Sequence, residues 1–182
     1  MYQTILVPLD GSVLSEQALP IAQTLAQRTS AAMHLVHVHT LNDGIYMEEL
    51  PVIDDQLHSL GRTHEHVYLE QVRERLATTA QISITTANPD TEGTVALTLA
   101  NYARDAACDL TIMATHGHSG FERFWLGSTT DALLRLTNMP LLLIRPKEQE
   151  PLTVPPAVQH IIIPLDGSHL AEAVLEQAVL RE

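Results

Sequence analysis

The sequence predicts an α/β fold, in which a parallel sheet carries helices on both faces. Short apolar runs rich in β-branched residues alternate along the chain with segments of helical periodicity, the pattern of strands joined by crossover helices. Strands in such a sheet are buried on both faces. The chain has 182 residues, 45% of them hydrophobic, so it can bury one good core but is too short for two domains of ordinary size.

The first half of the chain is expected to hold two strands and two helices. Residues 4–8 (TILVP) form the first strand, and the turn sequence Leu-Asp-Gly-Ser leads into apolar residues at helical spacing over 14–25. Residues 33–39 (MHLVHVH) predict the second strand. The apolar positions of 57–76 predict a long amphipathic helix, which Gly61 should weaken in the middle.

The second half is expected to add three strands and two helices. Residues 82–84 alternate between apolar and polar as a short third strand, and a turn follows at Asn-Pro-Asp. An Ala-rich helix over 94–107 leads to the fourth strand, 110–114 (LTIMA). A loop containing glycines comes next, and then a helix over 128–137 and a fifth strand over 141–145 (LLLIR).

The end of the chain repeats its beginning. Nine residues between Pro8 and Ala22 recur after position 163, and all nine are shifted by 156 positions, as from 8 to 164. We therefore expect one domain over 1–146, a linker rich in proline and charge over 147–157, and a partial second repeat over 158–182. The second copy contains only a first strand and a first helix.

Charge and cysteine content restrict the partners and the compartment. Ten Lys and Arg against 22 Asp and Glu give a net charge of -12, which repels nucleic acid and anionic membranes. The N-terminus does not resemble a signal peptide, and no apolar stretch approaches the ~18 residues that cross a bilayer. The lone Cys108, expected to be a small buried hydrophobe rather than a nucleophile, is consistent with a reducing compartment, so we expect a cytoplasmic protein.

Two loops are expected to form the ligand site, because ligands of open parallel sheets bind outside the carboxyl ends of the strands. The Asp10–Ser12 turn leaves the first strand, and a loop over 115–127 with three glycines leaves the fourth. Residues 127–130 (GSTT) then present amide N–H groups and hydroxyls at a helix start, which favours a phosphate without net positive charge. The loop has no Lys and is not a P-loop, and Arg123 is its only cation.

The glycine loop also carries a family pattern. The spacing Ala114-x2-Gly117-x9-Gly127-Ser128 resembles the nucleotide loop Gly-x2-Gly-x9-Gly-(Ser/Thr) of the universal stress protein family. The stretches TILVPLDGS, HLVHV and PLLLIRP resemble that family's first, second and fifth strands, so the resemblance covers about residues 2–146 in order. It implies an open five-stranded parallel sheet of the Rossmann-like, adenine nucleotide alpha hydrolase-like kind, dimerisation through the last strand, and ATP binding.

Carried over position by position, the resemblance also implies a set of ligand contacts. They are Pro8 and Asp10 beside the ribose and phosphates, the Val38 backbone against the adenine, Met113 and Ala114 at the base and sugar, and Gly117, Gly127, Ser128 and Thr129 around the phosphates. Mg²⁺ would enter with the phosphates. Ala114 stands where the pattern has its first glycine, so a positive φ there would strain the site by about 1 kcal/mol. Asp10 is equally able to cap the first helix.

The function expected from these features is that of an ATP-binding universal stress protein, a nucleotide-dependent regulator or stress-response factor with little or no catalysis. No general base stands out, and His116 and His118 are the nearest candidates. Two alternatives stay open. One is an interaction module of the same fold in which the Ala114 methyl blocks the nucleotide, and the other is an adenylyl-transferring or ATP-hydrolysing enzyme.

Neither histidine cluster is expected to bind a metal. On a strand, His37 and His39 share a face while His34 points to the other, so too few ligands converge for zinc. The histidines of His64-Glu65-His66 are expected on a solvated helix surface.

The last strand raises a question of association. A short apolar edge formed by Leu141, Leu142, Leu143, Ile144 and Arg145 is expected to pair with a second copy, giving a homodimer. Residues 158–182 have two options, since they are either disordered or add a strand over 161–163 to a neighbouring molecule.

Overall fold

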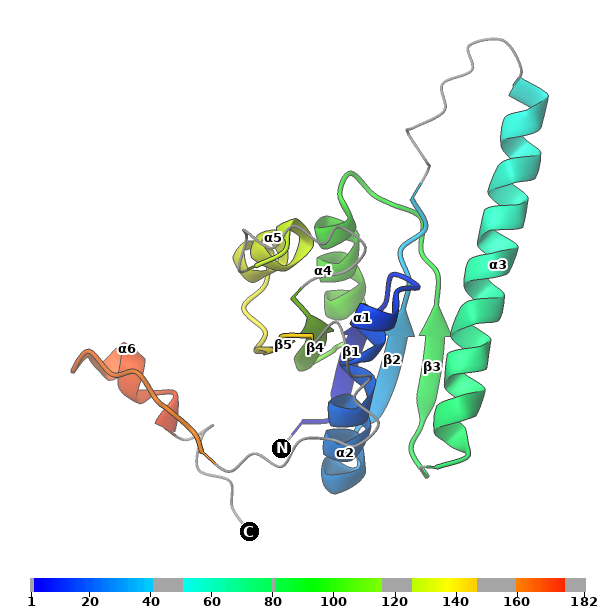
Figure 1. The fold of residues 1–182 in the computed structure, drawn as a ribbon. Helices are drawn as coiled ribbons and strands as arrows, with labels where there is room; N and C mark the ends of the chain where they lie inside the picture. The colour runs from blue at the N-terminus through cyan, green and yellow to red at the C-terminus, as the bar shows by residue number, and fades with distance from the viewer. Residues whose placement is uncertain (1, 41–50, 80, 116–125, 147–159, 176–182) are drawn as a thin grey trace.

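The computed structural model describes residues 2–40, 51–79, 81–115, 126–146 and 160–175, with the backbone alone for 51–59. Within these residues five parallel strands form one sheet in the order β3-β2-β1-β4-β5 (Figure 1). The strands are β1 (Thr4–Pro8), β2 (Ala32–Val36), β3 (Ile84–Ala87), β4 (Leu110–Ala114) and β5 (Leu141–Ile144). The predicted open parallel sheet is confirmed.

The described helices are α1 (Val13–Glu16), α2 (Leu19–Thr29), α3 (Pro51–Ala77), α4 (Val95–Asp105), α5 (Ser128–Leu136) and α6 (His169–Glu172). Those from α2 to α5 are divided between the two faces of the sheet. One core cluster joins the sheet to α2 and α3, and a second joins it to α4 and α5. The central strand β1 serves both, because Ile5 and Val7 enter the first cluster while Leu6 enters the second, and all three are fully buried.

Two of the expected helices differ from the prediction. The helix expected over 14–25 is broken at Gln17 and Ala18, because Pro20 has no amide hydrogen to continue a helix from α1 and instead sits in the first turn of α2. The long helix α3 is continuous, as predicted, but it begins earlier than expected, at Pro51. It runs beside β3 and extends past the end of the sheet (Figure 1).

The second and third strands also have other bounds than predicted. β2 ends at Val36 because its neighbour β1 ends at Pro8, and after the bond from Leu9 N to Val36 O the chain leaves the sheet towards α1. Residues 37–39 continue beyond the sheet with a single isolated bridge, between His39 and Asp90. β3 covers 84–87 rather than 82–84, because its register with β2 pairs Met33 with Ile84 and continues to Val36 with Ala87.

The repeat at the end of the chain forms the expected turn but no strand. Residues 160–167 have no strand in the structure, although α6 begins at His169, 156 positions after the start of α1 at Val13. This segment lies apart from the sheet, and its apolar side chains are exposed, with Ile162 at 92% and Leu170 at 87% (Figure 1). The expected linker over 147–157 lies outside the described residues.

None of the helices in the described residues combines the length and the apolar character that a membrane span requires.

Candidate functional site

The carboxyl ends of three neighbouring strands lie level with one another. β1 pairs with β2 on one side, Pro8 opposite Val36, and with β4 on the other, Leu6 opposite Thr111. Continuing both registers places Asp10 level with Val38 and with Thr115. The strand order reverses between β1 and β4, which is where parallel sheets of this kind bind their ligands.

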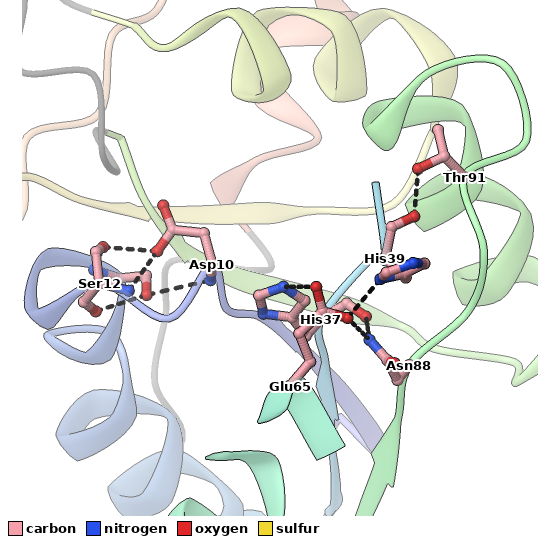
Figure 2. Close-up of polar contacts among 8 residues, drawn as sticks. Asp10, Ser12, His37, His39, Glu65, Asn88 and Thr91 are labelled. Carbon is pink, nitrogen blue, oxygen red and sulfur yellow. Dashed lines mark hydrogen bonds and ion pairs between the residues drawn. The ribbon is translucent and has the colours of Figure 1, made fainter. Parts of the chain in front are cut away.

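The turn after β1 is organised by Asp10. Its Oδ1 atom accepts hydrogen bonds from Ser12 N at 2.9 Å and from Ser12 Oγ at 2.6 Å. The cap of α1 is Ser12 itself, whose Oγ accepts from Ser15 N at 3.1 Å. Gly11 between them has φ +80°, a conformation that suits glycine. Asp10 therefore holds the capping residue in place and does not cap the helix directly (Figure 2).

The end of β4 contains the two residues expected at the base and sugar. Met113 and Ala114 are both buried, and Ala114 pairs with Ile144 of β5 as an ordinary strand residue. Among the described non-glycine residues only Ser30 and Ala107 have positive φ. Alanine in place of the family's glycine therefore costs no backbone strain.

Gly127 joins the start of α5 to the end of β4. Its N–H donates to Thr115 O at 2.9 Å, and a Cβ on Gly127 would lie 2.6 Å from that same oxygen. The φ of Gly127 is −64°, so glycine is required here by close backbone approach and not by conformation. Any side chain would push α5 away from β4.

The first turn of α5 presents unbonded amides. Gly127 is the N-cap and has no side chain to cap the helix, and the first bond of the helix runs from Asp131 N to Gly127 O at 2.9 Å. In the described part of the chain, the N–H groups of Ser128, Thr129 and Thr130 have no acceptor. Such amides are the usual anion-binding groups of a helix N-terminus.

Val38 lies beyond the end of β2 with its backbone directed towards β1. Val36 O accepts a hydrogen bond from Leu9 N, on the β1 side. His37 N and His39 N donate to Ala87 O and Pro89 O, on the opposite, β3 side. Because successive residues of an extended chain bond to opposite neighbours, the N–H and C=O of Val38 are directed over the Asp10 turn. Neither forms a hydrogen bond within the described residues. Its side chain is buried in the core of α4 and α5.

A polar cluster that the sequence did not predict lies on the face opposite the Val38 side chain. Glu65 of α3 lies 2.8 Å from Nδ1 of His39 and 3.5 Å from Nε2 of His37, and it accepts a hydrogen bond from Asn88 at 3.0 Å (Figure 2). Burial lowers the pKa of His37, against the opposing effects of Glu65 and Asp10. Glu65 is 19% exposed, whereas His64 and His66 are exposed as expected.

The sequence did contain part of the signal for this cluster. His37 and His39 were correctly expected on one face, and His34 on the other face bonds to Tyr102 of α4 at 2.9 Å. Nothing in the sequence indicated that Glu65 would lie under that face, because this depends on how α3 packs on the sheet. Within the described residues no group of three or more His, Cys, Asp or Glu is arranged to hold a metal ion.

The remaining predicted residues are distributed as follows. Pro8 is the partly buried last residue of β1, and Thr129 lies in the first turn of α5. Gly117 lies outside the described residues, as do the loop positions 116–125 that include His116, His118 and Arg123. Cys108 is half-buried, and burial, with a smaller effect of Asp109, raises its pKa to about 11, which disfavours the thiolate.

The comparisons with known proteins give a consistent relationship. The profile of the Universal stress protein family matches residues 1–145. The chain is 27% identical to Universal stress protein YxiE of Bacillus subtilis (strain 168), over 80% of this chain and 100% of the relative. Universal stress protein UspA from Lactobacillus plantarum superimposes with a TM-score of 0.69 at 25% identity, over 79% of this chain and 98% of that one.

Two more distant solved structures have the same fold. One is a universal stress protein in complex with cAMP, with a TM-score of 0.57, 20% identity, and coverage of 80% of this chain and 98% of that one. The other is a universal stress protein family protein from Arabidopsis thaliana with AMP bound, with a TM-score of 0.55, 11% identity, and coverage of 80% and 93%. With the family profile matched from residue 1 to residue 145, the chain belongs to the universal stress protein family.

Proposed function

We propose that the protein binds ATP, with Mg²⁺ carried by the phosphates, outside the carboxyl ends of β1 and β4, and acts as a nucleotide-dependent regulator. The proposal rests on two groups of backbone atoms, one on either side of Asp10, that form no hydrogen bond within the described residues. The Val38 N–H and C=O lie on the β2 side, and the open amides of α5 lie on the β4 side. The AMP and cAMP complexes of proteins with this fold support an adenine nucleotide as the ligand.

Val38 supplies the groups that read the base. An N–H donor and a C=O acceptor on one residue match the N1 acceptor and the N6 amino donor on one edge of adenine. Guanine presents the opposite order, with an acceptor at O6 and a donor at N1. A site with buried polar groups discriminates strongly against a ligand that leaves them unpaired. ATP should therefore bind more tightly than GTP.

The first turn of α5 supplies the groups that hold the phosphates. The amides of Ser128, Thr129 and Thr130 and their hydroxyls offer hydrogen bonds, and the helix dipole adds a local positive potential. The net charge of -12 repels an anion at long range, so the attraction has to be local. Gly127 fixes this turn against Thr115 and thereby beside the Asp10 turn.

The proposal is tested by the effect of nucleotide on thermal unfolding and by calorimetry. ATP with Mg²⁺ at 100 times Kd should stabilise the native state by about 2.7 kcal/mol, because it binds only the folded protein. Absence of both a melting shift and binding heat at millimolar ATP contradicts the proposal. Release of AMP and pyrophosphate would instead indicate the adenylyl-transferring enzyme.

A pair of variants at Ser128 separates the amide from the hydroxyl. Ser128→Pro removes one amide donor at the first helical position, where proline is well tolerated, and the preceding Gly127 already has φ −64° and ψ 153°, which proline requires of its neighbour. It should weaken ATP binding more than Ser128→Ala, which keeps the amide. Equal affinities of the two variants would argue against phosphate contact with that amide.

We further propose that two copies associate through β5. This strand is at the edge of the sheet, and Leu142 is 38% exposed. An apolar edge with unpaired backbone groups favours pairing with another strand.

A further inference from the structure

We propose that Glu65, His37, His39 and Asn88 act as a clamp that positions the Val38 backbone for recognition of adenine. This inference rests on the adenine site proposed above and assigns to it four positioning residues that do not touch the nucleotide. Figure 2 shows the four side chains gathered where β2 has ended, next to the turn of Asp10.

The first part of the clamp is a single carboxylate that holds both neighbours of Val38. Glu65 Oε2 lies 2.8 Å from His39 Nδ1, and Glu65 Oε1 lies 3.5 Å from His37 Nε2. Each neutral imidazole can donate one N–H to this carboxylate, so the contacts do not require a charged histidine. Asn88 Nδ2 donates to Glu65 Oε2 at 3.0 Å and fixes the carboxylate in turn.

The second part is a set of backbone bonds on the β3 side. His37 N donates to Ala87 O at 3.0 Å, and His37 O accepts from Asn88 Nδ2 at 2.8 Å. His39 N donates to Pro89 O at 2.8 Å, and His39 O accepts from Thr91. Both neighbours of Val38 thus direct their backbone groups to one side, which leaves those of Val38 on the other.

A clamp is needed here because the sheet no longer supports the chain. β1 ends at Pro8, two positions before the level of Val38, so within the described part of the chain residues 37–39 have a strand-like neighbour on one side only. A strand end with so few ladder bonds frays readily. The buried Val38 side chain on one face and the Glu65 contacts on the other hold the segment extended.

Burial gives the contacts of Glu65 their strength. The side chains of His37 and His39 are 14% and 6% exposed, so loss of the carboxylate leaves buried imidazole N–H groups without that acceptor. The other titratable groups that face His37 are Tyr68 of α3, whose ring packs edge-on against it, Asp10 of the β1 turn, and His39 itself.

The test compares two glutamates of α3 that both reach β3 or its continuation. Glu65→Ala removes the clamp, whereas Glu70→Ala removes a matched contact inside the sheet, the hydrogen bond that Thr86 Oγ1 donates at 2.6 Å at the level of Leu35. Affinities for Mg·ATP, Mg·GTP and inorganic tripolyphosphate are measured by calorimetry on the full chain. Glu65→Ala should weaken the affinity for Mg·ATP at least tenfold and bring the ratio of the ATP and GTP affinities near one. The affinity for tripolyphosphate should not change. Glu70→Ala should leave the ratio as in the parent protein.

Conservative variants distinguish positioning from a general loss of stability. Glu65→Gln retains an acceptor and should restore most of the ATP preference, and Asn88→Ala should lower it in part. If Glu65→Ala does not fold, the proposal is tested with Glu65→Gln and Asn88→Ala alone. In the absence of nucleotide, hydrogen exchange at the His39 amide should also accelerate in Asn88→Ala but not in Glu70→Ala.

The outcomes separate the clamp from the proposed function. If the parent protein prefers ATP to GTP and Glu65→Ala and Asn88→Ala keep that preference, the clamp is overturned while the nucleotide site stands. If the parent protein binds neither nucleotide, the proposed function fails, and the clamp fails with it. If Glu65→Ala lowers the affinity for all three ligands equally and Glu65→Gln does not restore it, the proposal that Glu65 positions the Val38 backbone is also overturned.

Discussion

At the scale of single residues, the turn Asp-Gly-Ser has one geometry in two very different surroundings. Gly11 has φ +80° and Gly167 has φ +82°, and in each copy the Asp Oδ1 accepts from the Ser N–H at 2.9 Å. The Ser Oγ caps the following helix at 3.1 Å in both. Among the described residues no strand lies beside the second copy, so this turn is determined by its own residues. The match supports our proposal that 158–182 repeats the start of the domain over 1–146.

The two glycines offer a matched test of what the turn contributes. Gly11→Ala should lower the free energy of unfolding by roughly 1–2 kcal/mol, because alanine is strained at positive φ while the His37 ring, 4.0 Å from the new Cβ, leaves space for it. Gly167→Ala introduces the same strain at a position where no described residue lies within 4 Å of the new Cβ, and it should leave domain unfolding unchanged. Denaturant titrations measure both, and an equal loss in the two variants would refute this account.

At the scale of elements, helix α3 shows packing overriding local propensity. α3 is continuous through Gly61, and its C-terminal half buries Leu69, Val72 and Leu76 against the sheet. Glycine in a helix costs about 0.5–1 kcal/mol, which is small beside the burial of three large side chains. Pro20 acts in the opposite direction, since the missing amide of a proline cannot be replaced by packing and the helix breaks.

Gly61 is accordingly a position where alanine should stabilise the protein. A Cβ there would meet His39 Cε1 at 3.7 Å, an ordinary contact, so Gly61→Ala should raise the free energy of unfolding by about 0.5–1 kcal/mol. Gly127→Ala is the contrasting variant and should lower it by roughly 1–3 kcal/mol, because the Cβ would meet backbone oxygen at 2.6 Å. Thermal unfolding in the absence of nucleotide measures the stability change of both variants. A loss of stability in Gly61→Ala would show that the contact with His39 is less tolerant than its distance indicates.

At the scale of the whole molecule, the strand order leaves two edges, β3 and β5, with different protection. β3 has α3 running beside it, whereas β5 exposes Leu142. The order also places β1 in the centre, so that its carboxyl end adjoins those of β2 and β4. The proposed ligand site and the proposed interface therefore lie at different parts of one sheet.

The proposed association through β5 is tested by measuring the molar mass of the protein in solution. The chain should run as a dimer in light scattering, and Leu142→Lys should shift it towards the monomer because a charge on an edge strand opposes pairing. Val13→Lys, which changes a 70% exposed apolar residue of α1 instead of one on the edge strand, is the control and should leave the mass unchanged. A monomeric mass for the parent chain across concentrations would exclude the interface.

The sequence by itself determined the strands 4–8 and 110–114, the Asp10 turn and the start of α5, because apolar β-branched runs and capping residues act over a few neighbours. The stretches that resemble the family, in their order along the chain, and the spacing of the glycine loop were likewise sufficient to indicate the family. Three features were decided only by the tertiary structure: the end of β2, the close approach that excludes a side chain at Gly127, and the position of Glu65 beneath His37 and His39. Those features depend on the register between strands and on the packing of a helix remote in sequence, and no local pattern specifies either.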